Sequence, residues 1–306
     1  MTKTAFLFAG QGAQYLGMAR DLYEQYDMVK STFEEASQVL GYDVRALIDQ
    51  DEEKLNQTRY TQPAILTTSL AIYRLLAEKG IRPAMVAGLS LGEYSALVAA
   101  GALDFKTALA LVAKRGAFME EAAPAGSGKM VAVLNADVAL IEEACQTASQ
   151  LGVVSPANYN TPGQIVIGGD VAAVDKAVEL LKEAGVKRLI PLNVSGPFHT
   201  ALLKPASEKL AQVLAETEFT EFQLPLVGNT EADIMEASRI KELLTRQIIE
   251  PVRFYDSIAK MQEAGVTEFI EIGPGKVLSG FMKKIDKSAI VHSVESVETL
   301  TALLEK

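Results

Sequence analysis

The segment from residue 129 to residue 194 places the strongest constraint on the fold, because short strand-like runs and longer helical runs follow one another there. The pattern predicts strands at 129–134, 153–159, 164–167 and 187–194, and helices at 137–151 and 171–184. The resulting order, β-α-β-β-α-β, is that of a ferredoxin-like α+β unit. A stretch of small and turn-forming residues at 123–128 precedes it. We therefore predict a small subdomain at 129–194, inserted into a larger domain made of 1–128 and 195–306.

Outside this unit, strand-like runs also alternate with longer helical segments, which is typical of the α/β class. The predicted strands are 4–8, 85–87, 224–228 and 269–272, and the predicted helices extend to Leu40 and cover 62–80, 93–100, 105–122 and a segment ending near Glu216. A chain of 306 residues is long enough to bury a substantial core. The sequence therefore predicts an α/β fold with an inserted α+β subdomain.

Charge and cysteine content exclude several classes of function. The formal net charge of −10 disfavours general binding to nucleic acid or to an anionic membrane. The single cysteine, Cys145, excludes intrachain disulfides and cysteine-cluster metal sites, and its place in a helical run favours a structural role. Neither histidine has a metal-ligand spacing, so we expect no bound metal. The apolar run Ala5–Ala9 is too short for a signal-peptide core or a membrane span, so we expect a cytoplasmic protein.

The stretch Gly88-Leu89-Ser90-Leu91-Gly92 has the G-x-S-x-G pattern of a nucleophile elbow. A predicted strand ends immediately before it and a predicted helix follows, which is the arrangement that exposes a serine at a sharp turn. The glycines permit such a turn, and the helix N-terminus favours a developing negative charge. The alternative is a tight turn that opens an ordinary buried helix, because a chance match in such a chain has odds of roughly one in ten.

A neutral serine needs a neighbouring base to act as a nucleophile, and the chain contains two histidines, His199 and His292. His199 follows Pro197 at the join between the two predicted domains, and such joins often line clefts. His292 lies in a strand-like run near the C-terminus, where a structural histidine is the simpler interpretation. The pattern favours His199 as the base, with an ordinary histidine as the alternative.

Arg115 interrupts an apolar stripe on its predicted helix. Ala108, Leu111, Val112 and Met119 share its face at helical spacing. A buried arginine needs a partner because an unpaired charge is costly inside a protein. Two interpretations fit: an internal ion pair with a glutamate, or a clamp for a substrate carboxylate, which a guanidinium binds in a bidentate manner.

Taken together, segments along nearly the whole chain resemble the acyltransferase family shared by fatty-acid and polyketide synthesis. The matching segments are FLFAGQGAQ, YTQPAIL, GLSLGEYSAL, the region around KRG, NYNTPGQIVIGG, SGPFHTALLKPA, RQIIEPVRF and EIGPGKVLSG. The resemblance implies a hydrolase-like α/β core with a parallel sheet and an inserted ferredoxin-like subdomain. It also implies transfer of a malonyl group from malonyl-CoA to the phosphopantetheine thiol of acyl carrier protein through a malonyl-serine intermediate. No cofactor is expected, and the family suggests a monomer.

The resemblance assigns the catalytic groups residue by residue. Ser90 matches the nucleophile and His199 the base. The oxyanion hole of the family uses two backbone amides, which match those of Gln11 and Leu91. A glutamine that matches Gln247 orients the histidine through its backbone carbonyl, so that no aspartate is required.

The resemblance also implies substrate contacts. Arg115 matches the arginine that pairs with the malonyl carboxylate, and Asn160 matches an asparagine near the cleft. Phe198 precedes the base, and in related synthase domains a phenylalanine there accompanies malonyl rather than methylmalonyl units because its bulk crowds an α-methyl group. Leu89 departs from the family, which usually has histidine before the nucleophile. We expect Leu89 to leave catalysis intact and to change only the packing behind the elbow.

Two other functions would use some of the same residues. A serine esterase or thioesterase would use Ser90 and His199 but would not need Arg115. A non-catalytic subunit that only docks acyl carrier protein would not need a serine, a base and an oxyanion hole. Because acyl carrier proteins and this chain are both acidic, docking requires a local basic face. The candidates are Lys182, Lys187 and Arg188 on the small subdomain, and Lys283, Lys284 and Lys287 near the C-terminus.

Overall fold

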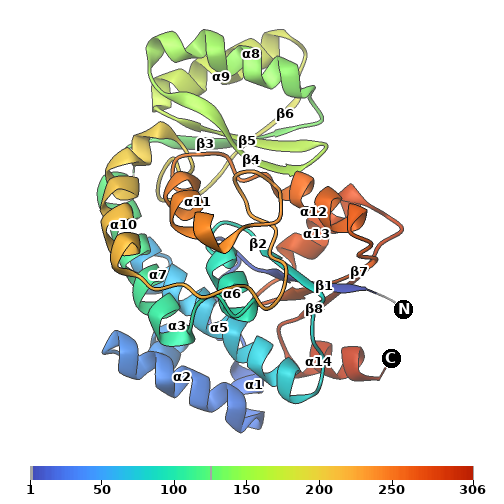
Figure 1. The fold of residues 1–306 in the computed structure, drawn as a ribbon. Coiled ribbons are helices and arrows are strands. Elements are labelled where there is room, and N and C mark those ends of the chain that lie inside the picture. The colour runs from blue at the N-terminus through green and yellow to red at the C-terminus, as the bar shows by residue number, and fades with distance from the viewer. Residues whose placement is uncertain (1–2, 125, 306) are drawn as a thin grey trace.

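The chain folds around two separate four-stranded sheets, one above the other in Figure 1. The structure is a computed structural model and describes residues 3–124 and 126–305. The lower sheet is parallel and combines strands from both ends of the chain, whereas the upper sheet is antiparallel and comes from the middle of the chain. The predicted α/β class with a separate α+β subdomain is therefore confirmed. The residue boundaries of the two domains stay a prediction.

The parallel sheet has the strand order β2-β1-β7-β8 and lies among helices. Its strands are β1 (Thr4–Phe8), β2 (Met85–Gly88), β7 (Glu268–Ile272) and β8 (Ile290–Val294). The helices of this part are α1 (Arg20–Gln25), α2 (Asp27–Leu40), α3 (Val44–Gln50), α4 (Glu52–Leu55), α5 (Thr58–Glu78), α6 (Gly92–Ala99), α7 (Phe105–Ala122), α10 (Lys204–Glu216), α11 (Ile240–Gln247), α12 (Phe254–Glu263), α13 (Val277–Ile285) and α14 (Val297–Leu304). Two short 3₁₀ turns, η2 (Ala201–Leu203) and η3 (Ala237–Arg239), precede α10 and α11.

After Thr4 the strand β1 is apolar and buried, because helices cover both faces of its sheet. Successive side chains of a strand point to opposite faces. Phe6 and Phe8 accordingly join the core formed with α5, α6 and α7, whereas Ala5 and Leu7 join a second core formed with α12 and α13. This burial holds β1 in the centre of the sheet. Its carboxyl end, and that of β2, are thereby placed at the same edge.

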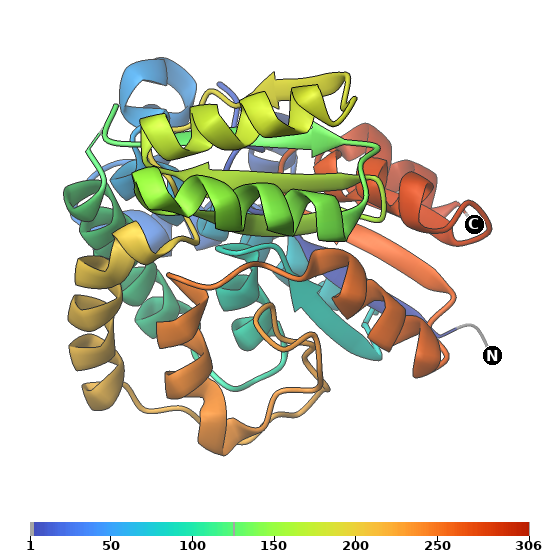
Figure 2. The same cartoon turned by 90° about the horizontal axis from the view of Figure 1, so that it is seen from above.

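The antiparallel sheet has the order β4-β5-β3-β6. Its elements are β3 (Lys129–Leu134), α8 (Val138–Ala148), the 3₁₀ turn η1 (Ser149–Leu151), β4 (Val154–Thr161), β5 (Gln164–Gly169), α9 (Val171–Glu183) and β6 (Arg188–Pro191). Figures 1 and 2 show α8 and α9 covering its outer face. Val131 and Ile167 pack into a core with these helices that also holds the buried thiol of Cys145. Met130 and Val166, one residue away, face the large domain instead.

The prediction of a strand at 224–228 is wrong, although this segment does reach β2 of the parallel sheet. Leu226 forms a single parallel bridge to Val86 of β2, and Val227 forms a single antiparallel bridge to Ile234. After Val227 the chain turns back, with the amide of Gly228 donating to the carbonyl of Asp233, so no further residue can extend along β2. The helix predicted from residue 62 begins earlier, at Thr58. Within the residues that the structure describes, no helix combines the length and apolar composition of a membrane span.

Candidate active site

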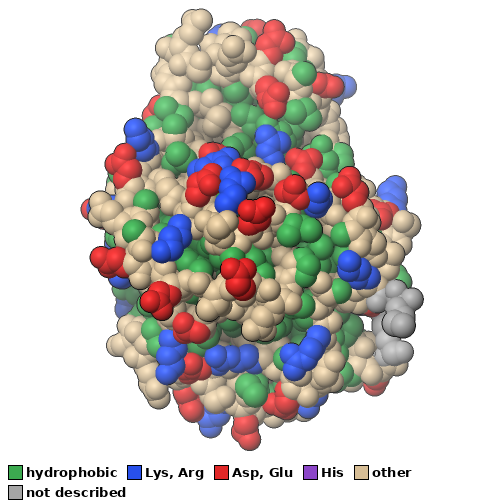
Figure 3. Space-filling model, viewed as in Figure 1, with side chains coloured by type: hydrophobic (Ala, Val, Ile, Leu, Met, Phe, Trp, Pro, Cys, Tyr) green, Lys and Arg blue, Asp and Glu red, His purple; other side chains and the backbone are tan. Residues whose placement is uncertain are grey.

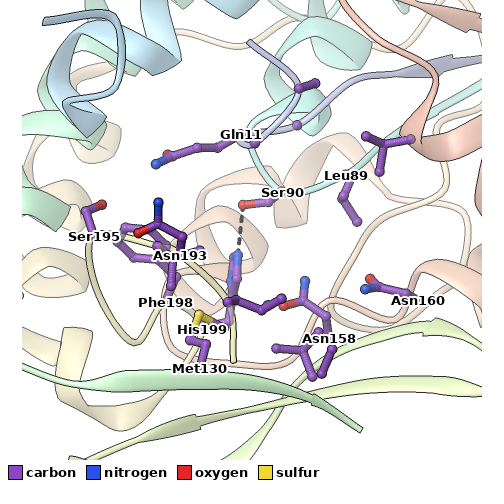
Figure 4. A pocket seen from close by; sticks show the side chains of 18 of the residues that line it. Gln11, Leu89, Ser90, Met130, Asn158, Asn160, Asn193, Ser195, Phe198 and His199 are labelled. Atoms are coloured by element: carbon purple, nitrogen blue, oxygen red, sulfur yellow. Dashed lines mark hydrogen bonds between the residues drawn. The ribbon is translucent and has the colours of Figure 1, made fainter. Parts of the chain in front are cut away.

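A cavity of about 720 Å³ lies between the two sheets (Figure 4). Its floor comes from the loops that follow β1 and β2, which agrees with the rule that ligands bind beyond the carboxyl ends of parallel strands. Residues of β3, β4 and β5 form the opposite wall. The predicted site residues that line it are Gln11, Leu89, Ser90, Asn160, Phe198 and His199.

Ser90 lies at a sharp turn between β2 and α6 with a φ of 52°, in the left-handed region that non-glycine residues rarely adopt. Neither flanking glycine, Gly88 or Gly92, has a positive φ. A glycine is required at both positions because neighbouring backbone atoms lie too close for a Cβ. A Cβ on Gly88 would lie 2.0 Å from the carbonyl carbon of Gly92, and a Cβ on Gly92 would lie 2.1 Å from the carbonyl oxygen of Phe8. The glycines thus permit the turn by leaving room, and the backbone strain falls on the serine itself.

His199 reaches Ser90 from the other side of the cavity (Figure 4), with 2.8 Å between its Nε2 and the serine Oγ. Its Nδ1 lies 2.7 Å from the backbone carbonyl oxygen of Gln247. A carbonyl can only accept, so Nδ1 carries the proton in the neutral ring and Nε2 is free to accept one from Ser90. Burial lowers the pKa of His199 to about 4, assisted by the charge of Arg115 and opposed by the bond to Gln247.

The lowered pKa of His199 predicts that its ring stays uncharged at physiological pH. Because the ring is neutral above about pH 4, the ring-nitrogen NMR signals of His199 in ¹⁵N-histidine-labelled protein should keep the pattern of the neutral Nδ1–H form from about pH 5 to about pH 8. They should change to the pattern of the charged ring only near and below the pKa. Titration of the labelled protein across this range checks the prediction, with circular dichroism as the control for folding. A titration midpoint of His199 near pH 6.5, the value of an ordinary histidine, would contradict it.

Arg115 lies behind Ser90, with only 1% of its surface exposed. It donates to the side-chain oxygens of Gln62 at 2.7 Å, Gln247 at 2.9 Å and Ser90 at 3.1 Å. Its Nε has no hydrogen-bond partner among the described residues. Burial lowers the pKa of Arg115, opposed by Tyr94 and then Glu93.

The oxygens that accept hydrogen bonds from Arg115 are neutral, so the direct ion pair with a glutamate that the sequence left open is not formed among the described residues. The buried Glu93 interacts with the guanidinium only electrostatically, and the guanidinium can form a direct ion pair with an incoming anion. Arg115 does not itself line the cavity, but its partners Gln62 and Ser90 do. A carboxylate attached to Ser90 would therefore meet Arg115 by displacing a neutral contact.

The two amides expected to form the oxyanion hole belong to Gln11, in the loop after β1, and Leu91, at the start of α6. Among the residues that the structure describes, neither amide donates a hydrogen bond within the protein. The Gln11 side chain lies in a polar cluster, donating to Thr58 at 3.1 Å and accepting from Gln62 at 3.3 Å. Free amides beside a nucleophile are suited to stabilise a tetrahedral oxyanion.

Two further cavity residues correspond to predicted substrate contacts. Phe198 is buried beside the base, and Asn160 donates to Gln164 at 3.2 Å while its buried Oδ1 has no hydrogen-bond partner among the described residues. Leu89 packs against the core around β1 and β2, and its side chain also lines the cavity (Figure 4), so it does more than the packing that we expected. A leucine at this position therefore makes that part of the cavity wall apolar.

Other sequence candidates lie outside the site. His292 of β8 pairs with Glu268 on the neighbouring strand, with 3.3 Å between its Nε2 and a carboxylate oxygen. Cys145 is buried in the small subdomain, and burial raises the pKa of its thiol to about 12. In the described part of the chain no group of three or more histidine, cysteine, aspartate or glutamate residues has the arrangement of a metal site.

Sequence reasoning missed Gln62, Glu93 and Asn229. Gln62 interrupts the apolar face of α5 as Arg115 interrupts that of α7, so the same argument could have found it. The available sequence signal for Glu93 was a charged residue within the short, mostly apolar segment that forms α6. In the structure its side chain is buried, with 1% exposed. Asn229 follows a segment whose place beside β2 only the tertiary structure reveals.

Known proteins resemble this chain over its full length. The acyl transferase domain family matches residues 5–303. The malonyl CoA-acyl carrier protein transacylase of Bacillus subtilis is 49% identical, covering 100% of this chain and 97% of the relative, and that of Escherichia coli K12 is 46% identical, covering 100% of both. The crystal structure of MCAT from Streptococcus pneumoniae superimposes with a TM-score of 0.98 at 73% identity, covering 99% of each chain. A complex of a type II PKS acyl-carrier protein with its malonyl-transacylase has a TM-score of 0.96 at 46% identity, also covering 99% of each chain.

Proposed function

Since this chain belongs to the acyl transferase domain family, we propose that it moves a malonyl group from coenzyme A to acyl carrier protein by double displacement at Ser90. The family membership and the full-length relatives support malonyl transfer in fatty-acid biosynthesis. The observation that carries the mechanism is the position of Ser90, which lies between a buried base and a buried cation. Its Oγ is 2.8 Å from His199 Nε2 and 3.1 Å from the Arg115 guanidinium.

In the first half-reaction, Ser90 Oγ attacks the thioester carbonyl carbon and its proton passes to Nε2 of His199. The carbonyl oxygen becomes an oxyanion, and we assign its stabilisation to the Gln11 and Leu91 amides, which have no acceptor among the described residues. The carbon–sulfur bond then breaks, and the coenzyme A thiolate takes the proton back from Nε2. The products are malonyl-serine and free coenzyme A. The Gln247 carbonyl stabilises the imidazolium that forms between these steps, so an aspartate is not needed.

In the second half-reaction, the phosphopantetheine thiol of acyl carrier protein attacks the malonyl ester. His199 accepts the thiol proton and returns it to Ser90 Oγ as the ester bond breaks. The carboxylate of a malonyl group lies two bonds from the reacting carbonyl carbon. Its receptor must therefore lie next to the nucleophile, where Arg115 is found. A carboxylate held by a guanidinium in this position favours malonyl over acetyl groups.

Labelled malonyl-CoA tests the function in two stages. Incubated alone with the protein, it should give an acyl-protein adduct, and later addition of acyl carrier protein should move the label to the carrier. Free malonate at both stages would instead identify the esterase or thioesterase alternative. The absence of any turnover would identify a subunit that only docks the carrier.

Phe198 supports a preference for malonyl over methylmalonyl groups. It is buried, it lines the cavity, and it directly precedes the base. An α-methyl group on the acyl chain would lie close to the reacting carbonyl, where a bulky ring leaves little room. Methylmalonyl-CoA and acetyl-CoA run in parallel with malonyl-CoA in the adduct assay measure this preference.

For the acyl carrier protein we propose docking on the lysines of α13. This helix contributes Val277 and Phe281 to the cavity and carries exposed Lys283 and Lys284, followed by Lys287. A carrier held there would be close to the cavity that its thiol must enter. In the second candidate group, Lys182 borders a different pocket, on the small subdomain. In the face seen in Figure 3, charges of both signs are mixed, so a local cluster has to provide the attraction.

The double charge reversal Lys283→Glu/Lys284→Glu should raise the KM for acyl carrier protein about tenfold. Acylation by malonyl-CoA should stay unchanged, because the first half-reaction does not involve the carrier. Steady-state kinetics with varied carrier, together with the adduct assay, separate the two effects. Lys182→Glu/Arg188→Glu is the matched control. A larger effect of the control pair would move the docking site to the small subdomain.

A monomeric state and a cytoplasmic location stay predictions. Sedimentation equilibrium of the purified protein tests the first, and fractionation of the source cells tests the second.

A further inference from the structure

We infer that Asn229 and Glu93 are positioning residues, which hold the Ser90 turn and the Gln247 side chain in one hydrogen-bonded unit beneath the cavity. The inference rests on the proposed role of Ser90 as nucleophile and deepens it. Neither residue lines the cavity, and both are buried, with 0% and 1% of their surface exposed. Their effect on the reaction therefore passes through the residues that they contact.

Asn229 clamps the two sides of the strained turn. Its Oδ1 accepts from the amide of Ser90 at 2.7 Å, and its Nδ2 donates to the carbonyl of Gly88 at 2.7 Å. The bridge between Leu226 and Val86 brings its segment alongside β2. A positive φ at a serine persists only when surrounding contacts enforce it. The side-chain amide of Asn229 supplies such contacts, one donor and one acceptor, on either side of the nucleophile.

Glu93 connects this clamp to Gln247. One carboxylate oxygen accepts from the backbone amide of Asn229 at 2.8 Å, and the other accepts from Nε2 of Gln247. The same Nε2 lies 3.0 Å from the carbonyl oxygen of Ser90. Burial raises the pKa of Glu93 to about 7, opposed by the bond from Asn229 and the charge of Arg115. Burying a carboxylate is costly unless hydrogen bonds satisfy it, and both oxygens of Glu93 accept one.

The contacts of this unit allow only one orientation of the Gln247 side-chain amide. The guanidinium of Arg115 can only donate, and it donates to Oε1 of Gln247. The carboxylate of Glu93, when ionised, can only accept, and it accepts from Nε2 of the same amide. The amide of Gln247 therefore cannot flip. Its fixed position also sets the backbone carbonyl that receives Nδ1–H of His199. Glu93 thus influences the base, although it does not touch it.

The variant Glu93→Gln tests the unit with almost no change in volume. Glu93 accepts hydrogen bonds from two donors, the backbone amide of Asn229 and Nε2 of Gln247. The NH₂ group of a glutamine at position 93 would face one of these donors with a second donor. A flip of the Gln247 amide would not help, because its NH₂ group would then face the guanidinium of Arg115. We expect the acylation rate constant at saturating malonyl-CoA to fall roughly 10²-fold, as for other misplacements of reacting groups. The KM for malonyl-CoA should change far less, because the binding surface is untouched. Ser95→Ala is the matched control: Ser95 is buried in the same helix, and its Oγ has no partner among the described residues.

A spectroscopic measurement separates positioning from general loss of structure. The chain has only two histidines, so ¹⁵N-histidine labelling gives two rings, His199 in the site and His292 in β8 as an internal reference. In Glu93→Gln the Nδ1–H signal of His199 should shift, while the signals of His292 stay in place. This readout needs no malonyl chemistry, so it can fail independently of the proposed function.

Asn229→Asp provides a second variant. Its carboxylate keeps an acceptor for the amide of Ser90 but turns an oxygen toward the carbonyl of Gly88, so acylation should again be slower at little-changed KM. The inference is overturned if Glu93→Gln acylates at the wild-type rate with an unmoved His199 signal. It is also overturned if the signals of both histidines change together with the loss of rate, since that marks a purely structural role.

Discussion

Ser90→Ala is expected to remove the covalent malonyl adduct and to lower the rate of malonyl transfer by roughly 10⁵-fold or more. The alanine has no Oγ to attack the thioester, and His199 then has no proton to accept at the position 2.8 Å from its Nε2. Residues that act as a unit fail together, so His199→Ala should give a loss of similar size. Intact-mass measurement after incubation with malonyl-CoA detects the adduct directly, and carrier labelling measures the rate.

Ser95→Ala is again the matched control for this prediction, because it removes a buried hydroxyl five positions further along the chain, where we assign no catalytic role. It should retain both adduct formation and transfer. An adduct that persists in Ser90→Ala would place the nucleophile elsewhere and would end the proposed mechanism. Transfer without any adduct in the wild type would mean direct attack of the carrier thiol on malonyl-CoA.

Arg115→Ala should lower kcat/KM for malonyl-CoA by roughly 10² to 10³-fold, the range expected when one partner of a desolvated ion pair is removed. The small rate with acetyl-CoA should change much less, because an acetyl group has no carboxylate for the guanidinium to bind. Arg115→Lys should lie between the two, since an ammonium keeps the charge but cannot form the bidentate bond. Kinetics with both thioesters measure the selectivity ratio.

The control for Arg115 is Lys114→Ala, an exposed cation on the same helix, which should leave both rates unchanged. Equal losses with malonyl-CoA and acetyl-CoA in Arg115→Ala would contradict the clamp. They would show instead that Arg115 serves the reaction only through its bond to the hydroxyl of Ser90.

The local elements of the site follow from patterns in the sequence. The strand–turn–helix around Ser90 has a short-range signal, because a strand, a G-x-S-x-G turn and a helix are read within fifteen residues or so. The prediction of Arg115 as a site residue and the order of helices and strands along the small subdomain follow from periodicity, which is also local. The segment at 224–228 shows the limit of such patterns. Its composition suits a strand, but the turn after Val227 leaves only a bridge beside β2.

The amino-acid sequence by itself determined the α/β class, the antiparallel insertion, and the residue types that a serine-based acyl transfer requires. Only the tertiary structure decided which groups meet beneath Ser90. Asn229 contacts a residue 139 positions earlier in the chain, and Gln247 contacts Glu93 across 154 positions. Hydrogen bonds over such separations depend on how β2, α6 and α11 pack, and packing direction has no period in the sequence. The reason is physical: a local pattern encodes which face of an element is buried, but not which polar side chain from a distant segment will contact that face.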